Sequence, residues 1–208
     1  MINTSNFSDS KPYCQRCGAC CEKNSPALHH EDQRLIDNHT ISLNQLITFR
    51  KGERVWDNFS SRLIALPQEI IKIKGQTPRW TCLFYQHKMK CCQIYSSRPW
   101  ECQIQNCWHD PETYKQSYTQ NRLTRADLIP STSDIWAIIK DHDISCDYAT
   151  LRQLSLENAQ DDLTAKIRYD YHLRDVVAEK MHINKDELDF YFGRPLVVTF
   201  NTKKPIEK

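Results

Sequence analysis

Four cysteines stand within eight residues near the start of the chain, in the run Cys14-Gln-Arg-Cys17-Gly18-Ala-Cys20-Cys21. Thiolates bind zinc and iron–sulfur clusters, so cysteines at this density are typical of a metal site rather than of core packing. A two-residue gap lets both sulfurs of a Cys-x-x-Cys turn face one centre, and Gly18 leaves the backbone free to curl. The spacing of the first three cysteines matches that of the first cluster ligands in bacterial ferredoxins. The run therefore predicts a metal centre.

Cysteine usage along the rest of the chain favours ligands over disulfides. Nine of the ten cysteines lie between residues 14 and 107, and two pairs, at 20–21 and 91–92, are adjacent in sequence. Adjacent pairs fit poorly in a simple disulfide plan. Residues 1–12 are polar and contain no hydrophobic signal-peptide core, so we expect a flexible leader and a cytoplasmic protein, where clustered cysteines stay reduced. No apolar run reaches the roughly 18–20 residues of a membrane span, so we expect no membrane partner.

Charge and composition argue against a nucleic-acid partner. The net charge is only +2 over 208 residues. Basic and aromatic residues do alternate between residues 49 and 80, as in a platform that binds phosphates and stacks on bases. We favour solvated outer faces of short strands with the apolar residues inward, since no RNP-type, helix-turn-helix or finger pattern accompanies them. The residues concerned are Phe49, Arg50, Lys51, Arg54, Trp56, Lys72, Lys74, Arg79 and Trp80.

A second cysteine group follows at a distance. Cys82 is followed by Cys92-x-Ile-Tyr95-x-x-Arg98-Pro-x-x-Cys102. Together with the first run, this order resembles the zinc- or iron-chelating domain family with the CxxCxxCC signature, whose members are also known as YkgJ family cysteine cluster proteins. The resemblance spans about residues 14–107 and implies metal chelation by the shared cysteines, as well as a distant relation to flagellin lysine N-methylase. The ligands that it implies are Cys14, Cys17, Cys20, Cys21, Cys82, Cys92, Cys102 and, as an eighth, Cys107.

Seven or eight thiolates exceed the four that one tetrahedral zinc or one four-iron cluster uses. Neighbours such as Cys20 and Cys21 would find it hard to aim at the same ion, because successive side chains diverge. Either two centres form, or one centre has reserve thiols beside it, and Cys91 leaves open which of the pair at 91–92 is the ligand. The ferredoxin-like spacing favours an iron–sulfur cluster, of the 4Fe-4S type, with zinc as the alternative.

Two residues near the second group are expected to line the bound cofactor, namely Arg98 and Tyr95. Arg98 would place a fixed positive charge beside the thiolates, donating hydrogen bonds to sulfur or to a backbone carbonyl. The alternative is a salt bridge from Arg98 to Glu101. Tyr95 and Trp100 would cover the metal and exclude water. Three histidines could also reach a metal, although half-exposed surface positions are the simpler interpretation: His29, His30 and His109.

The sequence pattern around these groups predicts an α+β fold. In this fold a small cysteine-rich region with short antiparallel strands packs on a mainly helical C-terminal half. Residues 22–40 predict an amphipathic helix, and a short helix follows Pro99. Brief β-branched or aromatic runs predict strands at 47–50, 54–56, 62–66, 69–73, 80–85 and 92–95. On this prediction Cys82 and Cys92 lie at neighbouring strand ends.

The C-terminal half is expected to be helical and chemically quiet. Its helices are predicted at 110–119, 133–139, 146–157, 158–182 and 184–193, with a last strand at 195–200. The longest places one apolar face toward the core, made of Leu163, Ile167, Tyr171, Leu173, Val177 and Met181. Cys146 is expected to be a buried apolar residue. The domains would be a leader at 1–12, a cysteine-cluster domain at 13–110 and a helical extension at 111–208.

These patterns predict a metal-chelating protein with an iron–sulfur cluster or zinc, acting in redox sensing, electron transfer or cofactor handling with a protein or redox partner. We find no nucleophile–base pair, phosphate loop or glycine-rich cofactor motif, and the chain has four glycines. Two alternatives remain open. The methylase resemblance implies an S-adenosylmethionine-dependent lysine methylase-like enzyme, and a zinc-stapled interaction module would need no chemistry at all.

Overall fold

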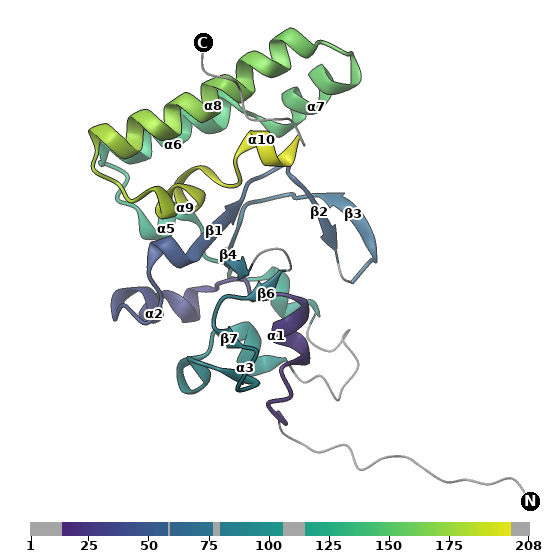
Figure 1. The fold of residues 1–208 in the computed structure, drawn as a ribbon, viewed down its shortest axis with the longest axis vertical. Helices are drawn as coiled ribbons and strands as arrows, with labels where there is room; N and C mark the ends of the chain where they lie inside the picture. The colour runs from purple at the N-terminus through teal and green to yellow at the C-terminus, as the bar shows by residue number, and fades with distance from the viewer. Residues whose placement is uncertain (1–13, 58, 77–79, 106–114, 201–208) are drawn as a thin grey trace, which may run out of the picture.

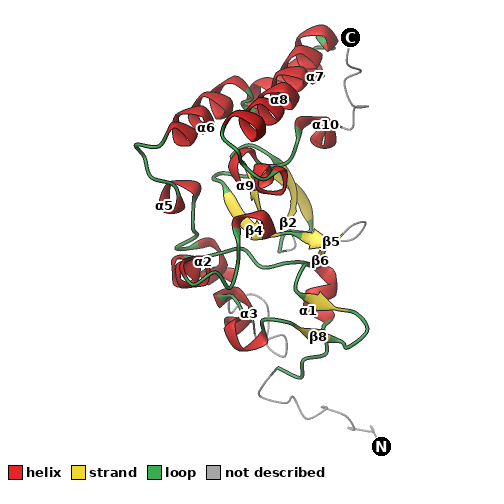
Figure 2. Ribbon diagram, turned by 60° about the vertical axis from the view of Figure 1, so that its left-hand side comes forward, coloured by secondary structure: helices red, strands yellow, loops and turns green. Residues whose placement is uncertain are grey.

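The structure, a computed structural model, describes residues 14–57, 59–76, 80–105 and 115–200. The fold is α+β, as the sequence predicts. Long helices gather at one end, and short paired strands with small helices make up the middle and the other end (Figures 1 and 2). The predicted leader, residues 1–12, lies outside the described residues. No helix of the described segments combines the length and the apolar character needed to cross a membrane.

The most buried strand pair joins β1 (Leu46–Phe49) to β4 (Ile70–Ile73) in antiparallel register. All four residues of β1 are buried, because α9 (Leu188–Phe192) packs across it. The Thr48 hydroxyl donates to the Phe190 carbonyl at 2.6 Å and so satisfies a polar group within this layer. The layer ties the front part of the chain to its last helices.

The remaining strands form three further two-stranded antiparallel sheets in the described residues. β2 (Arg54–Asp57) pairs with β3 (Arg62–Ala65), β5 (Gly75–Gln76) with β6 (Thr81–Cys82), and β7 (Tyr85–Gln86) with β8 (Cys91–Cys92). The first four predicted strands are confirmed to within one or two residues, because their β-branched and aromatic runs meet as antiparallel pairs.

The predicted strand at 80–85 is wrong, because the chain turns between β6 and β7. The Gln76 side-chain amide donates to the carbonyls of Cys82 at 2.9 Å and Tyr85 at 2.7 Å, and these bonds replace the ladder that one strand would make. Cys82 therefore pairs with Gly75, whereas Cys92 pairs with Tyr85 in another sheet. The predicted strand at 92–95 also ends early, in a 3₁₀ turn that begins at Tyr95.

The basic and aromatic residues form the predicted solvated strand faces only in part: Lys51 and Arg54 are exposed and Phe49 is buried, as expected. Arg50 is buried in the interior, with 3% of its surface exposed. Trp56, expected to face inward, is 60% exposed beside its cross-strand partner Leu63. Arg79 lies outside the described residues. On this hairpin Val55 packs toward the core, and Trp56 and Leu63 take the exposed positions.

The predicted helix at 22–40 is wrong. The segment holds α1 (Ala19–Lys23), a 3₁₀ turn at His30–Asp32 and α2 (Gln33–Asp37). Between α1 and the turn the chain runs extended along β4, where the Leu28 amide donates to the Ile71 carbonyl at 2.9 Å. Leu28 is therefore buried on a strand edge, while Leu35 is buried on the separate helix α2.

The C-terminal helices are α5 (Arg125–Leu128), α6 (Asp134–Ser145), α7 (Tyr148–Leu156), α8 (Gln160–Lys180), α9 and α10 (Leu196–Thr199). Four of them, α6 to α9, follow the predicted order, whereas α5 and α10 were not predicted. Ser133 occupies the N-cap position of α6, and Cys146 is fully buried, as expected. Part of the predicted helix at 110–119 lies outside the described residues, and its end is a 3₁₀ turn. The predicted strand at 195–200 is α10 instead.

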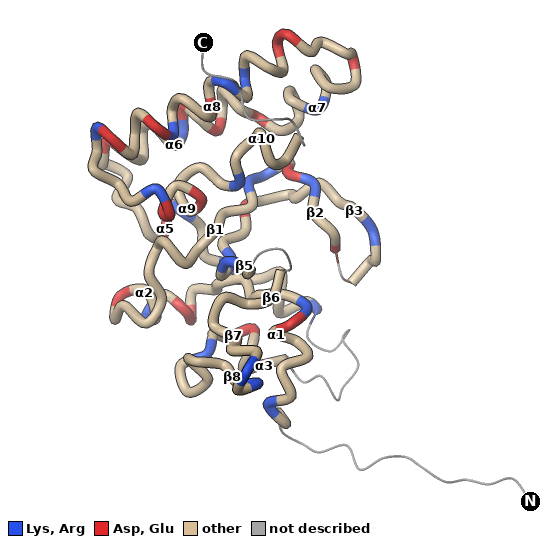
Figure 3. The backbone as a smooth tube through the Cα atoms, viewed as in Figure 1, with Lys and Arg blue, Asp and Glu red and all other residues tan. Residues whose placement is uncertain are grey.

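The buried face of α8 is polar at its centre, although Leu163, Ile167 and Val177 lie in the core as predicted. Charged residues recur along the length of this helix (Figure 3). Asp170, 1% exposed, accepts hydrogen bonds from His142 Nε2 at 2.8 Å and Arg174 Nε at 3.0 Å. Its second oxygen accepts from the Leu196 amide at 2.9 Å, which holds the first turn of α10 and explains why a valine-rich segment is helical.

Candidate metal centre

Gly18 positions the first cysteine run. Its φ of 80° is left-handed, and it stands at the N-cap of α1. A Cβ at this position would lie 2.3 Å from the Tyr85 hydroxyl, so only glycine allows the helix to approach β7 this closely. Tyr85 in turn donates to the Glu22 carboxylate at 3.2 Å, and Thr81 to the Glu22 carbonyl at 3.1 Å. The cysteines of α1 are thereby fixed against the strands that carry Cys82 (Figure 1).

Cys20 and Cys21 lie side by side on α1, with their sulfurs 3.9 Å apart. Two sulfurs that each lie about 2.3 Å from one tetrahedral zinc are about 3.8 Å apart. The sulfurs of Cys20 and Cys21 have nearly this separation, so the expected divergence of the two side chains is not observed. The hydrogen bond between the two thiols lowers the pKa of Cys20 to about 6 and raises the pKa of Cys21. The pair therefore loses its first proton more easily than its second.

Three further cysteines come close enough to influence this pair, from β6, β8 and α3 (Trp100–Ile104). Burial raises the pKa of Cys102, and the neighbouring charges of Cys82, Cys20 and Cys92 raise it further. Burial likewise raises the pKa of Cys82 to about 11, with Cys92 and Cys20 adding to the effect. Sulfurs from both halves of the cysteine pattern therefore share one neighbourhood.

The other predicted ligands are placed less closely. Cys14 and Cys17 lie on the lead-in to α1, where the Cys14 sulfur accepts from the Arg16 amide at 3.4 Å. Of the adjacent pair, Cys92 is the one that interacts electrostatically with Cys20 and Cys82, and Cys91 raises the pKa of Cys92. Cys107 and His109 lie outside the described residues. Within the described segments, no group of three or more His, Cys, Asp or Glu side chains stands in a geometry that could hold a metal ion.

Glu101 joins the two cysteine-bearing segments. Its carboxylate accepts from the Ala27 amide at 2.8 Å and lies 3.1 Å from His29 Nε2, while the Gln120 carbonyl is 2.8 Å from His29 Nδ1. His29 is fully buried, not half-exposed as expected, and both of its ring nitrogens are occupied. It is a structural residue that holds α3 and Cys102 against the chain that follows α1. The sequence signal that could have indicated Glu101 was its place next to Cys102.

Arg98 donates to the Cys102 carbonyl at 3.3 Å and to the Tyr95 carbonyl at 3.1 Å. The alternative, a salt bridge to Glu101, is not formed, because Glu101 is buried with Ala27 and His29. The guanidinium carbons of Arg98 and Arg16 lie 4.4 Å and 4.0 Å from the centre of the Tyr95 ring. The Arg98 charge opposes the rise that burial causes in the pKa of Cys92. The charge of Arg98 therefore acts on Cys92, and the contact of Arg16 with the Tyr95 ring is one that sequence reasoning missed.

Lys72 is a second cation that sequence reasoning missed, since it was assigned to a solvated face. Its ammonium donates to the Asn24 side chain at 2.9 Å. Burial lowers the pKa of Lys72 to about 8, while Glu101, Cys82 and Cys102 favour its charged form. Lys72, on β4, therefore brings a positive charge near Cys82 and Cys102.

The donor set fits zinc or iron chemically, because clustered thiolates beside cationic side chains suit borderline and soft metals. The arrangement defines a cysteine-rich metal-chelating domain. Residues 13–124 match the family described as "putative zinc- or iron-chelating domain", CxxCxxCC. The match covers more than half of the 208 residues, and the chain belongs to that family. No curated protein and no solved structure matches the chain.

Proposed function

We propose that the chain holds an iron–sulfur cluster through cysteines of α1, β6, β8 and α3, and acts in electron transfer, redox sensing or cofactor handling. What supports this proposal is that the charge of Cys20 raises the pKa of Cys82, Cys92 and Cys102, so that four elements bring these sulfurs near one another. The ferredoxin-like spacing of the first run supports iron and sulfur. The cationic surroundings would stabilise the negative charge of a thiolate-bound cluster and tune its potential.

A mononuclear zinc site is the second candidate, and the 3.9 Å separation of the Cys20 and Cys21 sulfurs favours it. In a 4Fe-4S cluster each cysteine binds a separate iron, whereas two sulfurs at this separation suit one tetrahedral ion. Zinc would give a structural module without redox chemistry. A protein partner would then bind the surface of this module and would not contact the metal.

Metal analysis separates the two candidates. Protein purified without oxygen is expected to be brown, to contain iron and acid-labile sulfide in equal proportion, and to bleach on reduction. A colourless protein with one zinc per chain and no sulfide would reject the cluster and leave the zinc site. A metal-free protein that takes up neither metal would reject both.

Single cysteine variants test the ligand set. Changing Cys20, Cys82 or Cys102 to serine is expected to abolish metal retention, whereas Cys146→Ala, a buried cysteine of the helical half, is expected to retain the metal. Cys92→Ser and Cys91→Ser decide which of that pair binds, and we expect the loss at Cys92. If Cys21→Ser keeps full metal content while Cys20→Ser loses it, a single centre with a reserve thiol is supported.

A further inference from the structure

The chain before α1 is attached to the second cysteine group at two points. Gly18 lies against the Tyr85 side chain, with no room for a Cβ between them. The Arg16 guanidinium carbon lies 4.0 Å from the centre of the Tyr95 ring. Tyr85 pairs with Cys92 across β7 and β8, and Tyr95 begins the 3₁₀ turn that follows Cys92. The chain before α1 is therefore anchored both to the partner strand of Cys92 and to the turn after it, next to β8 and α3 in Figure 3.

The backbone of Arg16 is held in an unusual conformation. Its φ of 55° is left-handed, which is uncommon for a residue other than glycine. Such conformations persist where the surrounding contacts hold them, and they concentrate at functional sites. The contacts here are the Arg16 amide, which donates to the Cys14 sulfur at 3.4 Å, and the guanidinium on the Tyr95 ring. Arg16 therefore joins a cysteine of the first run to the second cysteine group.

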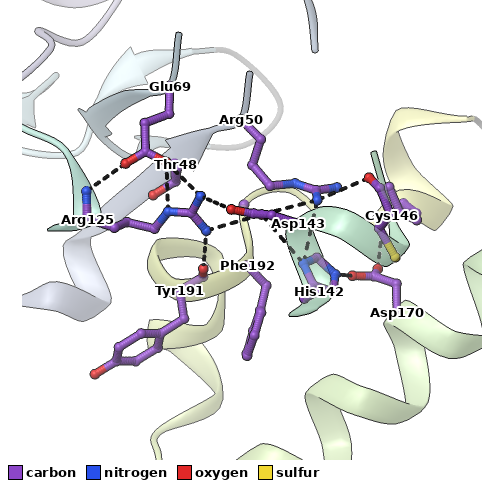
Figure 4. Close-up of polar contacts among 12 residues, drawn as sticks. Thr48, Arg50, Glu69, Arg125, His142, Asp143, Cys146, Asp170, Tyr191 and Phe192 are labelled. Carbon is purple, nitrogen blue, oxygen red and sulfur yellow. Dashed lines mark hydrogen bonds and ion pairs between the residues drawn. The ribbon is translucent and has the colours of Figure 1, made fainter. Parts of the chain in front are cut away.

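The attachment at Tyr95 is a cation–π contact without a carboxylate. Arg98 lies over the same ring at 4.4 Å, and its own hydrogen bonds go to carbonyls. Within the described residues, neither Arg16 nor Arg98 forms an ion pair. In the interior, by contrast, Arg125 is paired with two carboxylates (Figure 4). Because Arg16 is exposed, its contact with the ring is weak enough to open and close.

We propose that Arg16 and Tyr95 form a clasp that holds the chain before α1 across the segment that carries Cys92, and that opening this clasp exposes Cys92 and releases the metal. The inference rests on the proposed function only in so far as Cys92 binds the metal, whether as zinc or as a cluster. Arg16 and Tyr95 are positioning residues and need not touch the metal. The closed clasp limits the access of solvent and chelators to the Cys92 sulfur.

Alkylation of the reduced, metal-free full chain tests the clasp without any metal. The rate at which iodoacetamide modifies Cys92 is followed by mass spectrometry. Arg16→Gln is expected to raise this rate roughly two- to fivefold, the factor that corresponds to an exposed cation–π contact. Loss of a positive charge alone would raise the pKa of a nearby thiol and slow its reaction, so an acceleration reports greater access.

Release of metal from the protein as isolated, into an excess of chelator, tests the role of the clasp. Arg16→Gln and Tyr95→Leu are each expected to speed release by the same factor, and the double variant no further than the faster single one, because both remove one contact. Tyr95→Phe keeps the ring and should behave like the parent protein. Lys23→Gln removes an exposed positive charge from α1 itself and is the matched control, which should change neither rate.

Unchanged rates in Arg16→Gln overturn the proposal. Equal acceleration in Lys23→Gln would assign the effect to charge, and equal acceleration in Tyr95→Phe and Tyr95→Leu would assign it to the hydroxyl, so either result overturns the clasp. A chain that retains no metal rejects the proposed function, and the alkylation rates of the metal-free chain then still decide whether the clasp exists.

Discussion

Replacing Asp170 by asparagine removes the one carboxylate buried at the centre of α8. In the parent protein this group binds His142, Arg174 and the Leu196 amide, and its side chain is 2% exposed. Asparagine keeps the shape but leaves the Arg174 guanidinium, 8% exposed, without its closest counter-charge. Breaking a buried pair from one side costs about 3–5 kcal/mol. This is a large part of the roughly 5–15 kcal/mol that holds a domain folded.

Acid should remove part of the same stabilisation from the parent protein. Burial alone would raise the pKa of Asp170, but the His142 hydrogen bond and the Arg174 charge lower it from 3.8 to about 2. A shift of this size corresponds to about 2 kcal/mol. Because the folded pKa is the lower one, the contribution is present above about pH 4 and is lost as the pH falls through 2.

Urea unfolding followed by circular dichroism at pH 7, 4 and 2.5 measures both effects. Asp170→Asn is expected to unfold at much lower urea than the parent at pH 7, and the gap is expected to narrow at pH 2.5. Asp175→Asn is the control, since it lies on the same helix in an exposed pair with Lys185 and should change little. A gap below about 1 kcal/mol at pH 7, or one that stays constant down to pH 2.5, would refute the role given to Asp170.

Three further changes test the metal centre. Gly18→Ala is expected to lower metal content per chain, measured by emission spectroscopy, because the new Cβ meets Tyr85 and a left-handed alanine costs about 1–2 kcal/mol. Arg98→Gln is expected to weaken metal retention about ten- to a hundredfold in a chelator competition, since the charge beside Cys92 and the bond to the Cys102 carbonyl are lost. Chelation of the parent protein is expected to leave most of the helical circular dichroism signal unchanged, because the core formed by α7, the first half of α8 and Leu196 contains none of the proposed ligands.

The parts of the fold that sequence predicted are those in which local pattern and final environment agree. The helical repeat of α8 and the antiparallel runs of β1 and β4 are examples. The segment at 22–40 has apolar spacing that suits a helix, yet its residues after Pro26 are buried along the edge of β4. Similarly, Val197 and Val198 favour a strand, but a carboxylate distant in sequence receives the Leu196 amide and starts a helix. Both errors come from contacts far apart along the chain.

In the candidate site, too, the features set by local sequence could be predicted and those set by distant contacts could not. Cysteine spacing was enough to indicate a metal, because ligand chemistry depends on residue type. The roles of His29, Glu101 and Lys72 could not be predicted, because each depends on a partner tens of residues away. Arg98 was predicted correctly in kind, as a donor to a carbonyl near the thiols, since both partners lie within a few residues of it.

The hydrogen bonds of Glu101 bear on when the metal is inserted. Ala27 and His29 hold this carboxylate through bonds that involve only protein atoms, so the segments that follow the two cysteine groups are docked without any ion. We therefore expect these two segments to dock before a metal ion is bound. Because Cys20 is exposed, we expect an incoming ion to meet this sulfur first.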